Sequence, residues 1–153
     1  MKLERRSGYL VKRNAWHVGQ LERMPEFSLR SKAKLAQCDA RLQRVFEEVV
    51  KHFDCTVLEG RRSEERQNEL FRTGKSKVQY PNSKHNATVS LAADVAPYPI
   101  DWNDTKRFYL FGGFVLGIAR SLGVILRWGG DWDGDFQWND QTFHDLPHFE
   151  IRE

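Results

Sequence analysis

Hydrophobic and polar residues follow two different periods along the chain, and a regular helical period begins at Asp39. After it, apolar residues recur every three or four positions, which places them on one face of a helix of about four turns. They are Leu42, Val45, Phe46, Val49, Val50 and Phe53. The pattern predicts an amphipathic helix whose apolar stripe packs on a core.

Two further helices are predicted from the residues at their ends. Ser63 is a favourable N-cap, two glutamates follow it in the positively polarised first turn, and Gly74 stands just past the expected end. Asn103 or Asp104 is the expected N-cap of the next helix, which carries apolar residues at helical spacing and closes at Gly123. Both segments therefore have recognisable start and stop signals.

Short apolar runs between these helices predict strands at 56–58, 91–95, 124–128 and 149–152. The segment Pro97-Tyr98-Pro99 is expected to stop regular structure after the second of these. Helices and short strands alternate here without regular βαβ units. This order favours an α+β domain with a small antiparallel sheet flanked by helices.

The first 26 residues differ from the remainder of the chain. They are polar and basic and show no clear periodicity, so they are interpreted as an extension or as an arm that lies on the domain. Residues 27–153 are expected to form one domain, a length that can bury a core without disulfide bonds.

Composition narrows the function classes. A net charge of +3 is mildly basic, but lysine and arginine are scattered among acidic residues, which argues against a nucleic-acid partner. No apolar run approaches the roughly 20 residues that span a bilayer, and no signal peptide is recognisable. The two cysteines are too few for a disulfide framework. We expect a cytoplasmic protein without stable membrane insertion.

Side chains able to bind a metal gather in three short segments. His85, Asp94 and His148 together match the three His or carboxylate ligands that a catalytic zinc site uses, with one position left open. Asp145, three residues before His148, is close enough in sequence to act as a general base. A single histidine is more often structural, so composition alone does not establish the site.

The combined pattern resembles the M15 family of zinc peptidases, which includes D-Ala-D-Ala carboxypeptidases and the L-alanyl-D-glutamate endopeptidases of phage endolysins. The family has a Ser-x-His segment, an Ala-x-Asp segment and a carboxylate-x-x-His segment in that order, preceded by Gly-x-Arg-Ser and a glutamine. The likeness extends from about residue 27 to 153, and segments 83–86, 97–102 and 127–132 bring it closest to the endolysin branch. The matching segments here are Gly60-Arg61-Arg62-Ser63, Gln67, Ser83-Lys84-His85, Ala92-Ala93-Asp94 and Asp145-Leu146-Pro147-His148-Phe149-Glu150.

The resemblance implies the hedgehog/D-Ala-D-Ala peptidase-like fold and a role for each matched residue. His85, Asp94 and His148 would bind one Zn²⁺ per chain, Asp145 would be the general base, and Arg62 would stabilise the oxyanion. Eight residues separate His85 from Asp94, two more than in the commonest family form, and none of them is glycine. The longer segment is expected to bulge as a loop while both ligands stay at its ends.

Other candidates carry weaker signals. Ser83 either hydrogen-bonds near His85 or to substrate, or simply turns the loop. Arg62 has charged neighbours with which it can form an ordinary surface ion pair. Trp128 and Trp132 are expected along the substrate groove, although core packing accounts for most tryptophans.

Asp131, Asp133 and Asp135 alternate along the chain. In other proteins, aspartates with this spacing begin a calcium-binding EF-hand loop. Here the sixth position of such a loop is Phe136 instead of glycine, and the twelfth is Thr142 instead of glutamate. The segment is therefore interpreted either as a second, calcium-type site or as a solvated turn that positions the neighbouring tryptophans.

The leading hypothesis is a zinc endopeptidase that hydrolyses the L-Ala–D-Glu bond of peptidoglycan stem peptides, acting as a phage endolysin. The protein would be a monomer that stays in the host cytoplasm. A separate holin-type protein would then release it to the cell wall. The alternatives are a D-Ala-D-Ala carboxypeptidase of the same family and a non-catalytic wall-binding module. Asp145 argues against the binding module, because a binding domain needs no base beside its metal.

Overall fold

The computed structural model describes residues 5–6, 9–10 and 24–152. Strands β1 (Arg5–Arg6) and β2 (Tyr9–Leu10) form a short antiparallel pair. Most of the segment 1–26, interpreted above as an extension or arm, lies outside the described residues. That interpretation therefore stays a prediction.

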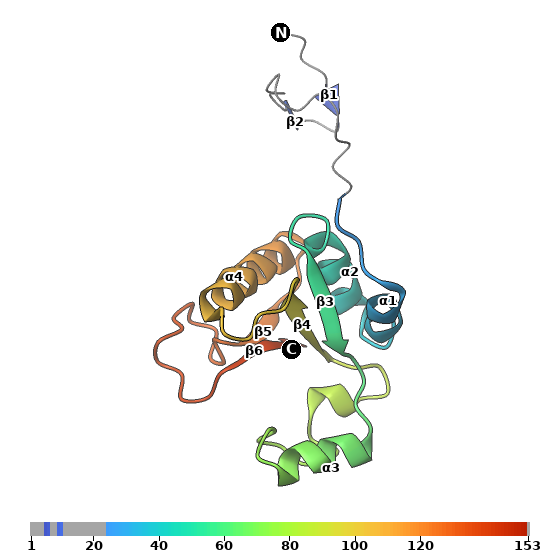
Figure 1. The fold of residues 1–153 in the computed structure, drawn as a ribbon, viewed down its shortest axis with the longest axis vertical. Helices are drawn as coiled ribbons and strands as arrows, with labels where there is room; N and C mark the ends of the chain where they lie inside the picture. Colours follow the sequence, from blue (N-terminus) through green and yellow to red (C-terminus); the bar gives the residue numbers. More distant parts are fainter. Residues whose placement is uncertain (1–4, 7–8, 11–23, 153) are drawn as a thin grey trace.

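A four-stranded antiparallel sheet forms the centre of the domain, with strand order β3-β4-β6-β5 (Figure 1). The strands are β3 (Cys55–Glu59), β4 (Ala92–Pro97), β5 (Leu126–Gly129) and β6 (Asp145–Ile151). The helices are α1 (Leu29–Leu35), α2 (Ala40–Val49), α3 (Glu64–Arg72) and α4 (Thr105–Ser121). The prediction of an α+β domain with a small antiparallel sheet is confirmed.

The core lies between one face of the sheet and the helices α1, α2 and α4. Phe46 of α2 and Phe111 of α4 both pack edge-on against Phe149 of β6, with ring centroids 5.4 and 6.0 Å apart. The apolar stripe predicted on α2 is buried here, apart from Phe53, which follows the helix and packs on the core from its edge. Alternation along β6 sends Phe149 and Ile151 into this core and His148 and Glu150 to the opposite face. The sheet thus separates a hydrophobic layer from the polar site.

Helix ends agree with the predicted caps. Ser63 accepts a hydrogen bond from the backbone of Arg66 at the start of α3, and Asp104 does the same for Arg107 at the start of α4. Gly74 and Gly123 follow α3 and α4 with φ of +73° and +71°, a conformation that favours glycine. Helix α3 stands apart from the core helices, at the end of the sheet where β3 finishes (Figure 1).

Most strand ends differ from the predictions by one or two residues, and the start of β6 differs by four. Strand β4 continues to Pro97, which pairs with Cys55 on β3, so the proline stops the strand two residues later than expected. Strand β6 begins at Asp145 instead of 149 and passes through Pro147. A register shift between Trp128 and Gly129 opposite this segment lets the proline be accommodated, because prolines enter sheets at such irregularities.

Candidate metal centre and catalytic cleft

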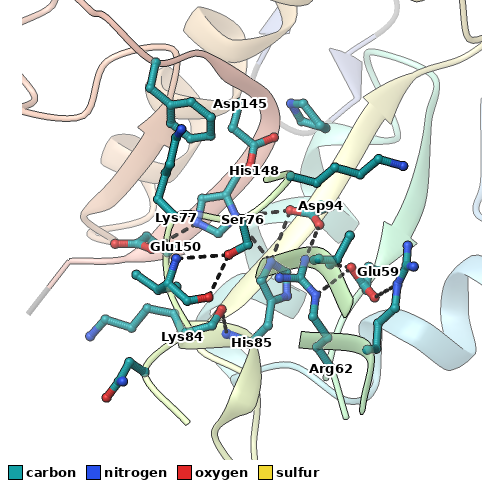
Figure 2. Close-up of a pocket in the computed structure, with 18 of the residues that line it drawn as sticks. Glu59, Arg62, Ser76, Lys77, Lys84, His85, Asp94, Asp145, His148 and Glu150 are labelled. Carbon is teal, nitrogen blue, oxygen red and sulfur yellow. Dashed lines mark hydrogen bonds and ion pairs between the residues drawn. The ribbon is translucent and has the colours of Figure 1, made fainter. Parts of the chain in front are cut away.

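Three side chains from different elements converge on one point (Figure 2). Nε2 of His85 lies 3.2 Å from Oδ1 of Asp94 and 3.2 Å from Nδ1 of His148, and the last two atoms are 3.1 Å apart. His85 belongs to a short 3₁₀ turn (Lys84–Asn86), Asp94 to β4 and His148 to β6. The structure brings together the three side chains that the sequence analysis named as metal ligands, in a group that could hold a metal ion.

The outer nitrogen of each imidazole faces an acceptor. Nδ1 of His85 is 2.6 Å from the carbonyl oxygen of Gly60, and Nε2 of His148 is 3.0 Å from Oε2 of Glu150. An imidazole that donates its proton outward presents a lone pair on the inner nitrogen. Two nitrogen lone pairs and one carboxylate oxygen therefore face the same point, an arrangement that a cation stabilises.

The spacing fits zinc. Tetrahedral Zn²⁺ with bonds of about 2.0–2.1 Å places its ligand atoms about 3.3–3.4 Å apart, close to the 3.1–3.2 Å found between the three inner atoms. Two imidazoles and one carboxylate are also a donor set that zinc accepts readily. The residues present fit a zinc ion with one position open toward the cleft.

The electrostatics of the group also favour a positive charge at its centre. Burial alone would raise the pKa of Asp94, but the histidines beside it hold that pKa well below its usual range. Burial alone would lower the pKa of His148, but its hydrogen bonds to Asp94 and Glu150 outweigh burial and raise it to about 10. Without a metal, a proton on His148 supplies the positive charge that the surrounding acceptors require.

The segment around His85 is fixed by a network with the segment after β3. The Ser83 hydroxyl accepts a hydrogen bond from the backbone of His85, and the Asn86 side chain accepts one from the backbone of Ser83. The Arg62 amide donates to the His85 carbonyl at 2.8 Å, and Asn86 returns a bond to the Arg62 carbonyl at 3.1 Å. Ser83 thus caps this turn and also lines the cleft.

Arg62 is buried and holds the outer oxygen of Asp94. Its Nη2 donates to Oδ2 of Asp94 at 3.1 Å and to Glu59 at 2.7 Å, while Nη1 donates to Gln67 at 2.9 Å. These buried contacts differ from the surface ion pair that was the alternative interpretation of Arg62 in the sequence. The role in oxyanion stabilisation implied by the resemblance stays a prediction.

Asp145 begins strand β6 and faces the cleft beside the metal ligands. Burial raises the pKa of its carboxyl group, and the negative charge of Asp94 raises it further. Within the described part of the chain, no hydrogen bond to its carboxylate contributes to this pKa. A cleft carboxyl group with a raised pKa and no competing partner has the properties of a general base.

The cleft has a volume of about 840 Å³, and both aromatic and basic residues line it. Trp132 lies 5.5 Å from the His148 ring, centroid to centroid, and the exposed Trp102 also lines the cleft. The basic residues of its wall are Arg62, Arg66, Lys75, Lys77, Lys84 and Arg127.

Trp128 does not line the cleft, so its predicted place along the substrate groove is wrong. Its indole is only 4% exposed and is stacked over Phe149 on the core side of the sheet. Its Nε1 donates to the Leu146 carbonyl at 2.7 Å. Residue alternation explains the difference, because Trp128 pairs with Phe149 in β6 and shares its face.

The aspartate segment after β5 is an ordered turn. Asp131 is buried, and its carboxylate accepts hydrogen bonds from the backbone of Gly134, Asp135 and Phe136 at 2.9–3.2 Å. Carboxylate oxygens of Asp131, Asp133 and Asp135 lie within 4.8 Å of one another, and the last two residues are exposed. These contacts match the turn interpretation, and calcium binding stays a prediction.

Two carboxylates hold the side chains of this site in a way that the sequence analysis did not predict, although Glu150 stands in the matched segment. Glu59, at the end of β3, accepts two hydrogen bonds from Arg62. Glu150 contacts His148 from the same strand. The spacing of two residues between His148 and Glu150 was a usable signal, since such residues share one face of a strand.

A comparison with known protein families decides the classification. Residues 24–152 match the family described as phage L-alanyl-D-glutamate peptidase. The chain belongs to that family. It is therefore a peptidase, and the resemblance noted in the sequence to this branch is confirmed.

Two individual relatives agree with this assignment to the phage peptidase family. The L-alanyl-D-glutamate peptidase of Escherichia phage T5 is 28% identical over 134 residues, which are 82% of this chain and 97% of that protein. The crystal structure of Serratia marcescens L-Ala D-Glu endopeptidase ChiX matches with a TM-score of 0.68 at 28% identity, covering 84% of this chain and 91% of ChiX. Among the residues that the structure describes, no helix is long and apolar enough to cross a membrane.

Proposed function

We propose that this peptidase is a zinc-dependent endopeptidase that hydrolyses the L-Ala–D-Glu bond of peptidoglycan stem peptides. The observation that carries the proposal is the convergence of His85, Asp94 and His148 beside Asp145 in one cleft. The names of the phage T5 and ChiX relatives support the bond assigned. Residues 27–153 are the catalytic domain in this proposal.

Each side chain has a defined task in the reaction. When bound, zinc supplies Lewis acidity toward the scissile carbonyl and the attacking water. Asp145 accepts the proton of that water and delivers a proton to the leaving amine. Arg62 keeps the outer oxygen of Asp94 in place, and Trp132 forms an aromatic wall beside the metal ligands.

The basic wall of the cleft suits an anionic peptide. A glutamate that follows alanine keeps one carboxylate when its other carboxyl group continues the chain. Lys75, Lys77 and Lys84 line the cleft, and within the described residues none of them has an acidic group within ion-pair distance. Their charge favours a substrate that carries free carboxylates near the scissile bond.

The family also suggests a biological setting, which is part of the proposal. A phage-encoded peptidase of this kind would act on the host wall at the end of infection, as a monomer. A separate holin-type protein would give it access to its substrate.

Mass analysis of muropeptides after digestion of purified wall tests the assignment. The expected products carry new amino termini on D-Glu, with no new reducing sugars. Release of free D-Ala would move the activity to the carboxypeptidase branch, and new reducing ends would show glycan cleavage. Wall binding without any product would identify a binding module.

A further inference from the structure

Glu150 lies on the same face of the sheet as the metal ligands. In the register of the strands, His148 of β6 pairs with Asp94 of β4, and Glu150 of β6 pairs with Arg127 of β5. Because alternate residues of a strand share a face, the backbone itself sets Glu150 beside His148. Figure 2 shows both side chains in the wall of the cleft.

Both carboxylate oxygens of Glu150 are engaged. Oε2 lies 3.0 Å from Nε2 of His148, and Oε1 accepts a hydrogen bond from Nη1 of Arg127 at 3.3 Å. The Glu150 residue is 8% exposed. A buried carboxylate fixed at both oxygens is well suited to orient the ring that it contacts.

We propose that Glu150 is a positioning residue, which keeps the proton of His148 on Nε2 and so directs the Nδ1 lone pair to the metal. This inference rests on the metal site of the proposed function. Without the Glu150 acceptor, the neutral imidazole can carry its proton on Nδ1, the nitrogen that faces Asp94 and His85. That tautomer has no lone pair to offer at the metal position.

The same geometry distinguishes Glu150 from the general base. Its Oε2 contacts Nε2, the ring nitrogen of His148 that does not face the other ligands. Asp145, in contrast, faces the cleft without a hydrogen bond of its own within the described residues. Glu150 therefore acts on the ligand and Asp145 on the reacting groups.

The test is zinc affinity, measured by competition with a chromophoric chelator on the full-length protein. Glu150→Ala removes the acceptor, and we expect zinc to bind about 10–100-fold more weakly, the usual effect of losing such a partner. Glu150→Gln keeps an acceptor oxygen and is expected to lose less, which preserves the test if the alanine variant folds poorly. Glu47→Ala is the matched control, because Glu47 is exposed on α2, on the other side of the sheet.

A second measurement reads the tautomer directly. In long-range ¹H–¹⁵N spectra of the zinc-loaded parent, His148 should carry its proton on Nε2. Zinc affinity of Glu150→Ala within twofold of the parent would overturn the inference. So would a variant that binds zinc normally but loses turnover, since Glu150 would then act in the chemistry.

The test of Glu150 and the test of the proposed activity can fail independently. A parent that binds zinc tightly but does not cleave wall would contradict the proposed activity and leave the affinity comparison valid. A parent that binds no zinc would overturn both.

Discussion

His148 lies directly opposite Asp94 across strands β4 and β6, with Nδ1 of the imidazole 3.1 Å from Oδ1 of the carboxylate. The sheet register therefore positions two of the three candidate metal ligands, and a paired backbone holds side chains more precisely than loops do. His85 comes from a loop turn, and its ring is fixed by the Gly60 carbonyl at 2.6 Å. The three candidate ligands are thus pre-arranged by backbone contacts.

Removing the metal should abolish activity. We expect that chelation stops wall hydrolysis and that added Zn²⁺ restores it, because the three ligands converge at zinc-like spacing. His85→Ala should lose both bound zinc and activity, since two protein ligands hold the ion poorly. Metal content by mass spectrometry and wall turbidity are the measurements. Full activity in a metal-free preparation would contradict the zinc mechanism.

Asp145→Asn should separate chemistry from metal binding. The amide keeps the size of the side chain but cannot accept the proton of water, so the rate should fall by about 10²–10⁴-fold. Zinc content and thermal stability should remain near those of the parent, because Asp145 contacts none of the ligands by a hydrogen bond within the described residues. Steady-state kinetics with metal analysis checks both points. A near-parental rate in a zinc-loaded variant would leave Asp145 without a catalytic role.

In the metal-free protein, His148 should be an imidazolium at neutral pH. Its hydrogen bonds outweigh burial and raise its pKa to about 10. A raised folded-state pKa stabilises the metal-free fold fully below the ordinary histidine pKa of about 6.5, and this contribution is lost as the pH rises toward 10. NMR titration of the His148 ring and melting temperatures across this range are the measurements. A neutral ring at pH 7 would show that the acceptors do not hold the proton.

The sequence analysis named side chains that the structure places together, but it missed the boundaries of the strands around them. The order of the segments that resemble the M15 family named His85, Asp94, His148 and Asp145, because such motifs are local in the sequence. The start of β6 was missed because Pro147 is a poor strand residue, and only the irregular pairing with β5 shows how the strand accommodates it. Such pairing is a property of two distant segments, which a local pattern does not contain.

Helix α1 and the location of Trp128 also could not be predicted from local sequence patterns. Helix α1 has only seven residues and buries two of them, Ser31 and Leu35, so it offers too short a pattern for periodicity to detect. Trp128 was expected in the groove from its residue type. The face it occupies is decided by its pairing with Phe149. Gly112 and Gly130 leave space for its ring, since a Cβ at either position would lie 2.4 Å from the indole.

Arg62→Lys tests whether this side chain supports the metal ligand. Lysine keeps the charge but cannot reproduce the contacts of Arg62 with Asp94, Glu59 and Gln67. Zinc binding should weaken by about 10-fold, as is usual when a partner of a ligand is lost. Chelator competition measures this directly. Unchanged zinc affinity with a reduced turnover number would instead support the oxyanion role.

Trp128→Phe and Trp132→Phe form a matched pair that separates the core from the cleft. Trp128→Phe removes the donor to the Leu146 carbonyl, so the free energy of unfolding should fall by about 1 kcal/mol. KM should stay unchanged, because this ring lies in the core.

Trp132→Phe reduces an aromatic surface beside His148 in the cleft and should raise KM by about 2–10-fold. Urea denaturation and kinetics on a soluble stem peptide give the two readouts. An increase in KM for Trp128→Phe without loss of stability would return Trp128 to the substrate groove and contradict its assignment to the core.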